Sequence, residues 1–189
     1  KIKAKQPEFR DEKLERYKKE FDIPDYDAQI ITNSKHMADL FEAATAICKK
    51  PKKVSNWLMG ETLRLLKENN MDPEDLSFAP ENLAKLVDLA DAGTVNSSVA
   101  KEVFEQIFKE NVDPEVYIEE HGLKTVNDEG ALKATIEQIV SENPQSVADY
   151  KGGKKKAIGF LVGQTMKAMK GKADPASVNK ILKEILDQE

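Results

Sequence analysis

The sequence contains little cysteine and histidine, which limits the chemistry it can carry. Its single cysteine, Cys48, cannot form a disulfide within the chain and is typical of a small buried apolar side chain in a reducing compartment. His36 and His121 have no Cys or second His at metal-ligand spacing, so we interpret both as structural or surface residues. The two glycines before Lys154 lack the earlier Gly and the following Ser or Thr of a phosphate-binding loop. We therefore expect no catalytic residue, no metal site and no cofactor in this chain, which by itself is not an enzyme.

Long apolar runs are also missing. No stretch approaches the roughly 18 to 20 apolar residues that a membrane span needs, and no signal peptide opens the chain. We expect a soluble protein with no membrane partner, cytoplasmic in a bacterium or archaeon and organellar in a eukaryote. The chain begins with Lys1 rather than Met, and its opening KIKAKQPEF reads like the middle of a protein. We therefore expect a piece of a longer protein.

Glycine, proline and aromatic residues are sparse, whereas 40% of the residues are hydrophobic and 33% are charged. This balance is typical of a helical protein, and apolar residues recur at helical spacing with no alternating strand pattern of useful length. One helix is expected over Lys52–Glu68, and Ser34, Asn96 and Asp174 are expected N-caps. The sequence therefore predicts an all-α fold.

The best internal boundary is Asn111-Val112-Asp113-Pro114, where Asp at an N-cap and Pro at the first helical position restart the chain. We expect a larger helical domain over residues 1–111 and a small helical-bundle tail domain over residues 112–189. The short polar linker motivates the hypothesis that the tail moves about residues 111–114.

Positive charge is concentrated in one segment of an acidic protein. The formal net charge is −5, yet Lys151 to Ala173 carries seven lysines and no acid, which leaves 22 basic and 34 acidic residues elsewhere. Local patches of this kind steer anionic partners.

A helix expected over Lys154–Lys170 would have two different sides. Advancing about 100° per residue places an apolar arc on one side, made of Ile158, Leu161, Val162, Thr165, Met166 and Met169. The opposite side carries Lys156, Gly159, Phe160, Gly163, Lys167 and Lys170.

This second side permits two interpretations. Lysines neutralise phosphates, glycines allow a backbone to approach closely, and an aromatic ring stacks on an unpaired base. Gly171-Lys172 also leads into the N-terminus of the next helix, which favours a phosphate, although Asp174 at its cap opposes this. Alternatively, Gly159 and Gly163 form a close helix–helix contact in a protein-interaction module, and the lysines are a solvated face.

Four strings resemble a known family. They are KKVSNWLMGE (52–61), AGTVNSSVAKEVFEQIF (92–108), GLKTVNDEGAL (122–132) and KKKAIGFLVGQTMKAMKGKADPASVNKIL (154–182). With matching order and spacing over essentially the whole chain, they are similar to the C-terminal part of the B subunit of the aspartyl/glutamyl-tRNA amidotransferase. The last string also resembles YqeY-like proteins.

The resemblance implies a non-catalytic helical and tail region of a larger ligase. That enzyme converts Asp-tRNA(Asn) or Glu-tRNA(Gln) to Asn-tRNA(Asn) or Gln-tRNA(Gln) with ATP, Mg²⁺ and glutamine, and the chain would reach the A and C subunits through the parent B subunit. The implied partner of the tail is tRNA(Asn) or tRNA(Gln).

We combine the resemblance with the two-sided helix to predict a tRNA-contact surface. Its residues are Lys151, Lys154, Lys156, Gly159, Phe160, Gly163, Lys167, Lys170 and Lys172. Trp57 lies on an apolar stripe and is expected to pack in a core or between domains rather than contact RNA.

Overall fold

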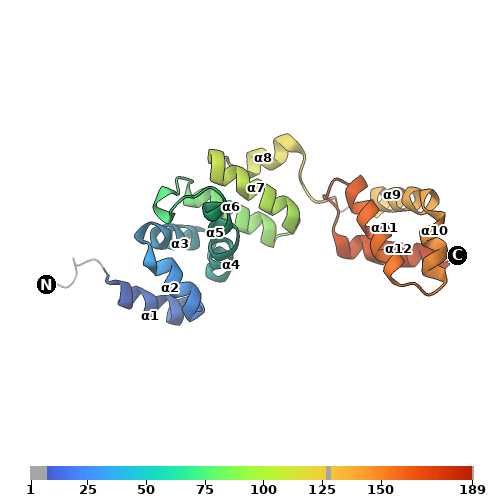
Figure 1. Ribbon diagram of the computed structural model, residues 1–189. Coiled ribbons are helices and arrows are strands. Elements are labelled where there is room, and N and C mark those ends of the chain that lie inside the picture. Colours follow the sequence, from blue (N-terminus) through green and yellow to red (C-terminus); the bar gives the residue numbers. More distant parts are fainter. Residues whose placement is uncertain (1–7, 127–128, 189) are drawn as a thin grey trace. The chain divides into compact units, whose positions relative to one another are not determined.

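The structure is a computed structural model that describes residues 8–126 and 129–188. Every regular element in those ranges is helical, and an isolated parallel bridge between Val126 and Ala173 is the only strand-like pairing there (Figure 1). The predicted all-α fold class is therefore confirmed.

The chain divides into two compact units. The first holds the residues up to Asp91 together with Lys101–Glu120, and the second holds Ala92–Ala100 and the residues from His121 on. The domain boundary at residues 111/112 stays a prediction, as does motion about 111–114.

The first unit is organised around the helix α3. Its elements are α1 (Arg10–Glu20), α2 (Asp25–Asn33), α3 (Lys35–Cys48), α4 (Pro51–Trp57), the π-helical turn η2 (Leu58–Thr62), α5 (Leu63–Glu68), the 3₁₀ turn η3 (Pro73–Asp75), α6 (Pro80–Asp91), α7 (Ser97–Glu110, from Lys101 on) and α8 (Pro114–His121, up to Glu120). Helix α3 packs against α2, α4 and α6. Its Phe41 is fully buried, and the Phe41 and Tyr17 ring centroids lie 4.9 Å apart. This apolar centre explains why the short helices of this unit hold together.

Helix caps follow the sequence signals closely. The Met37 N–H donates to Ser34 Oγ at 3.2 Å, and the Val99 N–H donates to Asn96 Oδ1 at 2.9 Å. Each side-chain oxygen satisfies an N–H group that has no partner within the helix. The predicted caps at Ser34 and Asn96 are confirmed.

The prediction of a single helix over Lys52–Glu68 is wrong, because the five-residue π turn η2 interrupts the α-helical segment. Within η2, the Leu63 N–H reaches the Leu58 carbonyl, one residue farther back than in an α-helix. The buried Thr62 hydroxyl donates to the Trp57 carbonyl at 3.0 Å and supports this wider turn. Apolar periodicity does not detect such a turn, since the chain stays helical on both sides of it.

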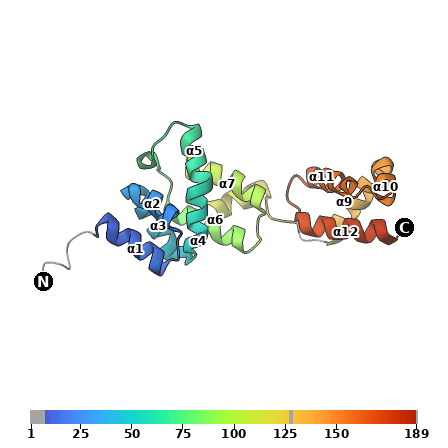
Figure 2. The same cartoon turned by 60° about the horizontal axis from the view of Figure 1, so that its bottom comes forward.

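The second unit is a small helical bundle of α9 (Glu129–Glu142), α10 (Pro144–Lys151), α11 (Lys156–Ala168) and α12 (Pro175–Gln188). Helices α9, α11 and α12 contact one another, and α10 packs on α11 (Figures 1 and 2). Their shared core contains Leu132, Ile136, Ile139, Leu161, Ala173, Val178, Leu182 and Leu186. This core holds α11 by one side and leaves its other side exposed.

Candidate nucleic-acid interface

Helix α11 is shorter than the sequence indicates. It was expected over Lys154–Lys170 but spans Lys156–Ala168, because Gly153 before it has φ +92° and Lys170 after it has φ +53°. At its end, the Gly171 N–H donates to the Met166 carbonyl at 2.8 Å and closes the helix with a left-handed turn. Lys154 and Lys170 therefore lie outside the helix, and the helical wheel does not determine their direction.

The apolar arc of α11 faces the core of the second unit, as predicted. Leu161 and Thr165 have no exposed surface, and the Thr165 hydroxyl donates to the Leu161 carbonyl at 2.9 Å. The other members of the arc pack partly buried against the same core: Ile158, Val162, Met166 and Met169.

The opposite side of the helix is exposed to solvent. We define the α11 face as its exposed residues Lys156, Gly159, Phe160, Gly163 and Lys167. Phe160 is 49% exposed despite being a large apolar residue. The α11 face thus brings together five of the nine predicted site residues on little more than three helical turns, about 16 Å of helix.

The two glycines of the α11 face are not packing contacts among the described residues. A Cβ atom built on Gly159 or Gly163 would meet no heavy atom within 4 Å outside the neighbouring helix backbone. A close helix–helix contact would place another backbone or side chain within that distance. Within the described part of the chain, the Gly-x-x-x-Gly pattern therefore serves no interhelical packing.

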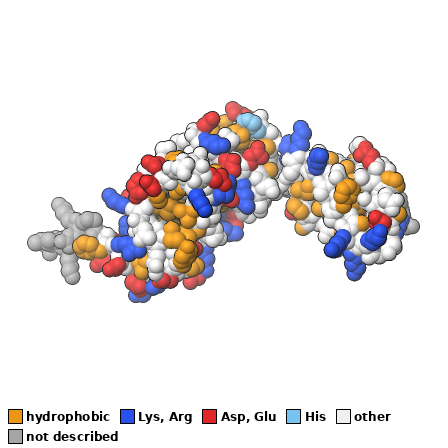
Figure 3. All heavy atoms as spheres, in the orientation of Figure 1, with side chains coloured by type: hydrophobic (Ala, Val, Ile, Leu, Met, Phe, Trp, Pro, Cys, Tyr) orange, Lys and Arg blue, Asp and Glu red, His pale blue; other side chains and the backbone are white. Residues whose placement is uncertain are grey.

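The lysines of the α11 face lie away from acidic side chains. Among residues 8–126 and 129–188, Lys156 and Lys167 lie within ion-pair distance of no carboxylate. Some lysines of the first unit are paired, since Lys53 pairs with Asp91 at 3.4 Å and Lys52 pairs with Asp22. Figure 3 shows acidic and basic side chains interspersed on the first unit. The α11 face is thus a region of uncompensated positive charge.

The remaining predicted site residues flank α11. Lys151 ends α10, and Lys154 pairs with Asp149 at 3.2 Å, which offsets part of its charge. Lys155 is exposed just before α11 and belongs with these flanking lysines, although the wheel of the helix gave no reason to choose it.

Lys172 is held differently from the lysines of the α11 face. It is half-buried, and its Nζ lies 3.9 Å from the position of a Cβ built on Gly122. Its carbonyl accepts a hydrogen bond from the Val126 N–H at 2.9 Å, which fixes the backbone of the turn between α11 and α12. Lys170 and Lys172 therefore belong to this turn rather than to the α11 face.

The N-terminus of α12 carries its own anionic group. Asp174 Oδ2 accepts hydrogen bonds from the Ser177 hydroxyl at 2.8 Å and the Ser177 N–H at 3.1 Å, which confirms the predicted cap. These hydrogen bonds lower the pKa of the Asp174 carboxyl. Because this carboxylate already occupies the helix end, the structure gives no support to a phosphate there.

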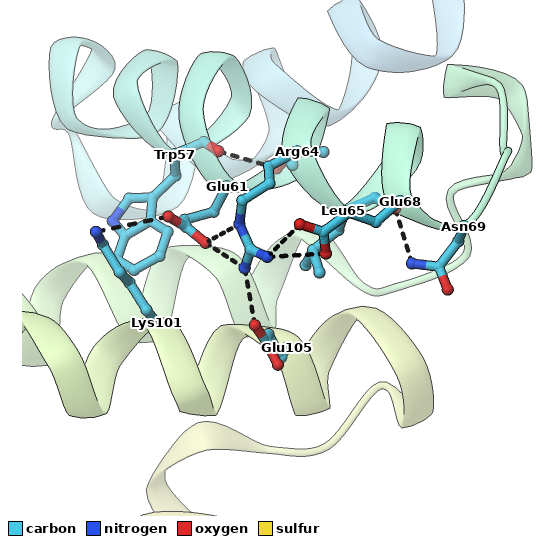
Figure 4. A network of polar contacts seen from close by, with 9 residues as sticks. Trp57, Glu61, Arg64, Leu65, Glu68, Asn69, Lys101 and Glu105 are labelled. Carbon is cyan, nitrogen blue, oxygen red and sulfur yellow. Dashed lines mark hydrogen bonds and ion pairs between the residues drawn. The ribbon is translucent and has the colours of Figure 1, made fainter.

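The first unit contains an ion network that no sequence motif indicated (Figure 4). Arg64 donates to Glu61 and to Glu105, each at 2.7 Å, and to Glu68 at 2.9 Å. The hydrogen bonds to Glu105, Glu61 and Glu68 raise the pKa of the Arg64 guanidinium. The spacing of Glu61, Arg64 and Glu68 on a helix could have suggested two of these pairs, but Glu105 comes from α7.

Trp57 and His36 both contact other residues of the first unit. Trp57 is partly buried, and its ring centroid lies 5.2 Å from that of Phe104, in agreement with the expected packing role. His36 Nε2 lies 2.6 Å from the Leu76 carbonyl. In the described ranges, no group of three or more His, Cys, Asp or Glu residues could hold a metal ion.

Comparison with known proteins identifies the family. A family model described as the GatB domain matches residues 39–186, which is most of the chain and includes all four strings quoted above. The chain belongs to the GatB domain family. The match extends from within α3 to within α12, so the GatB domain includes residues of both compact units.

Curated relatives agree with this assignment. The chain is 71% identical over 185 residues to the B subunit of the aspartyl/glutamyl-tRNA(Asn/Gln) amidotransferase of Agathobacter rectalis, covering 98% of this chain and 39% of that protein. It is 62% identical over 187 residues to the protein of the same name from Lachnoclostridium phytofermentans, covering 99% of this chain and 39% of that protein. The chain thus spans about two fifths of the length of these relatives.

Among the described residues, no helix is long and apolar enough to cross a membrane.

Proposed function

We propose that this chain is the non-catalytic, tRNA-contacting part of the B subunit of an aspartyl/glutamyl-tRNA amidotransferase. The parent enzyme would convert Asp-tRNA(Asn) and Glu-tRNA(Gln) to Asn-tRNA(Asn) and Gln-tRNA(Gln), using ATP, Mg²⁺ and glutamine together with the A and C subunits. The names of the relatives support this assignment.

The observation that carries the tRNA role is the α11 face. It holds two lysines without ion-pair partners among the described residues, beside two glycines that leave the helix backbone open. Unpaired lysines neutralise phosphates and release counterions, so a polyanion gains more here than at the paired lysines of the first unit. Contacts of this type position an RNA without reading its sequence, so tRNA shape rather than sequence would be recognised.

The test is a titration of the chain with a tRNA(Gln) transcript over a range of salt concentrations. We expect the logarithm of the association constant to fall with the logarithm of salt concentration, by about 0.7 to 0.9 for each neutralised phosphate. A slope of two or more corresponds to the two α11 lysines and at least one flanking lysine. Binding that does not respond to salt, or binding only to a protein partner, would support the alternative of a protein-docking face.

Gly163 provides a variant that separates folding from binding. Gly163→Ala should raise the free energy of unfolding by about 0.5 to 1 kcal/mol, because Ala favours a helix interior and a Cβ there meets no neighbour. The same methyl group would obstruct a close phosphate and lower tRNA affinity. Urea unfolding followed by circular dichroism and the tRNA titration measure the two effects.

The matched control for this variant is Gly153→Ala, which should destabilise the protein, because φ +92° strains any residue with a side chain. A loss of stability in Gly163→Ala would contradict the open space seen at that position. Unchanged tRNA affinity in a stabilised Gly163→Ala protein would mean that RNA does not approach the helix backbone there.

A further inference from the structure

Phe160 is the feature of the α11 face that charge alone does not explain. Of the described residues in the second unit, it is the only large apolar side chain with high exposure, at 49%. The other large apolar residues of α11 pack on the core, including its neighbour Leu161. A single exposed ring is too small for an apolar docking patch, which makes a protein partner a poor match.

The surroundings of the Phe160 ring leave it accessible from the C-terminal side. Side chains on a helix lean toward its N-terminus, so a side chain at position 163 would lie over the turn that contains Phe160. That position is Gly163, and no heavy atom lies within 4 Å of the place a Cβ would take. The ring therefore borders an open space on the helix surface.

Positive charge brackets this open ring along the helix. Lys156 is one turn before Phe160, and Lys167 is two turns after it on the same side. Neither lysine pairs with a carboxylate among the described residues. An aromatic face between two cations matches a nucleotide, which presents a flat base between phosphates.

We propose that Phe160 stacks on one unpaired nucleobase, so that the α11 face binds an open loop of RNA in preference to a paired helix. This inference rests on the proposed tRNA role and specifies which part of an RNA the face takes. A base within a duplex is already stacked on both sides and offers its face to no protein ring, whereas an unpaired base does.

The experiment uses the full chain and two RNA hairpins with the same number of phosphates. One hairpin has a loop of adenines, and the other has an abasic loop in which the bases are removed and the phosphates are kept. We expect the wild-type chain to bind the adenine loop roughly tenfold more tightly, a ratio within the range for one stacked base. Phe160→Leu should bind both hairpins equally, and Phe160→Trp should retain the preference.

Salt dependence and fluorescence distinguish stacking from a general loss of binding. The salt slope should be the same for wild type and Phe160→Leu, because their phosphate contacts are the same. A 2-aminopurine in the loop should lose fluorescence on binding the wild-type chain but not Phe160→Leu. Circular dichroism checks that the variant is folded.

Three results would overturn the stacking role, and they leave different conclusions about tRNA. A wild-type chain that binds both loops equally with a steep salt slope, or a Phe160→Leu chain that keeps the preference, would exclude stacking and leave the lysine contacts intact. No binding to either hairpin would overturn the stacking role, and the proposed function falls with it if the tRNA(Gln) titration also shows no salt-dependent binding.

Discussion

Reversing the charge of both lysines of the α11 face is expected to weaken tRNA binding at least about thirtyfold near 0.1 M salt. Each phosphate contact contributes a slope of about 0.7 to 0.9, which corresponds to roughly five- to eightfold in affinity at that salt concentration. Lys156→Glu with Lys167→Glu removes two such contacts and adds repulsion. The salt slope should fall by about 1.4 to 1.8 in the same titration.

The matched control places the same charge change elsewhere in the second unit. Lys133 on α9 and Lys183 on α12 are exposed, and neither belongs to the α11 face. Lys133→Glu with Lys183→Glu changes the net charge by the same amount. If this control weakens tRNA binding as much as the α11 variant does, the effect comes from overall charge, and the α11 face is not the contact surface.

Replacing Leu161 by Ala should have the largest effect on folding in the second unit. Leu161 has no exposed surface and lies in the core shared by α9, α11 and α12. Truncating a fully buried Leu costs about 2 to 5 kcal/mol, from lost apolar burial and from the cavity left behind. A loss of this size is a large fraction of the free energy of unfolding of a small domain.

Two probes can assign this loss to the second unit. The only tryptophan, Trp57, lies in the first unit, so its fluorescence reports unfolding there, whereas circular dichroism follows helices of both units. We expect Leu161→Ala to shift the dichroism transition to lower urea and to leave the Trp57 transition in place. The neighbouring Phe160→Ala is the control, with an expected change within about 1 kcal/mol because Phe160 is half-exposed. Equal shifts of both probes in Leu161→Ala would show that the two units unfold as one.

The candidate site was only partly predictable from the sequence. The wheel of α11 assigned Lys156, Gly159 and Lys167 to the exposed side correctly, since helical periodicity depends only on spacing. It could not exclude Lys170 from the helix, because the sequence does not indicate that this lysine adopts the left-handed conformation. The pairing of Lys154 with Asp149 was also missed, because it depends on the turn between α10 and α11.

By itself, the sequence determined the all-α fold class, the helix caps at Ser34, Asn96 and Asp174, and the resemblance to the B subunit of the amidotransferase. These features are local, because a cap or an apolar arc needs only residues a few positions apart. Only the tertiary structure decided that Gly159 and Gly163 face open space and that the lysines beside them lack carboxylate partners among the described residues. Both depend on which distant residues the fold brings near the helix, and the spacing within one segment does not contain that information.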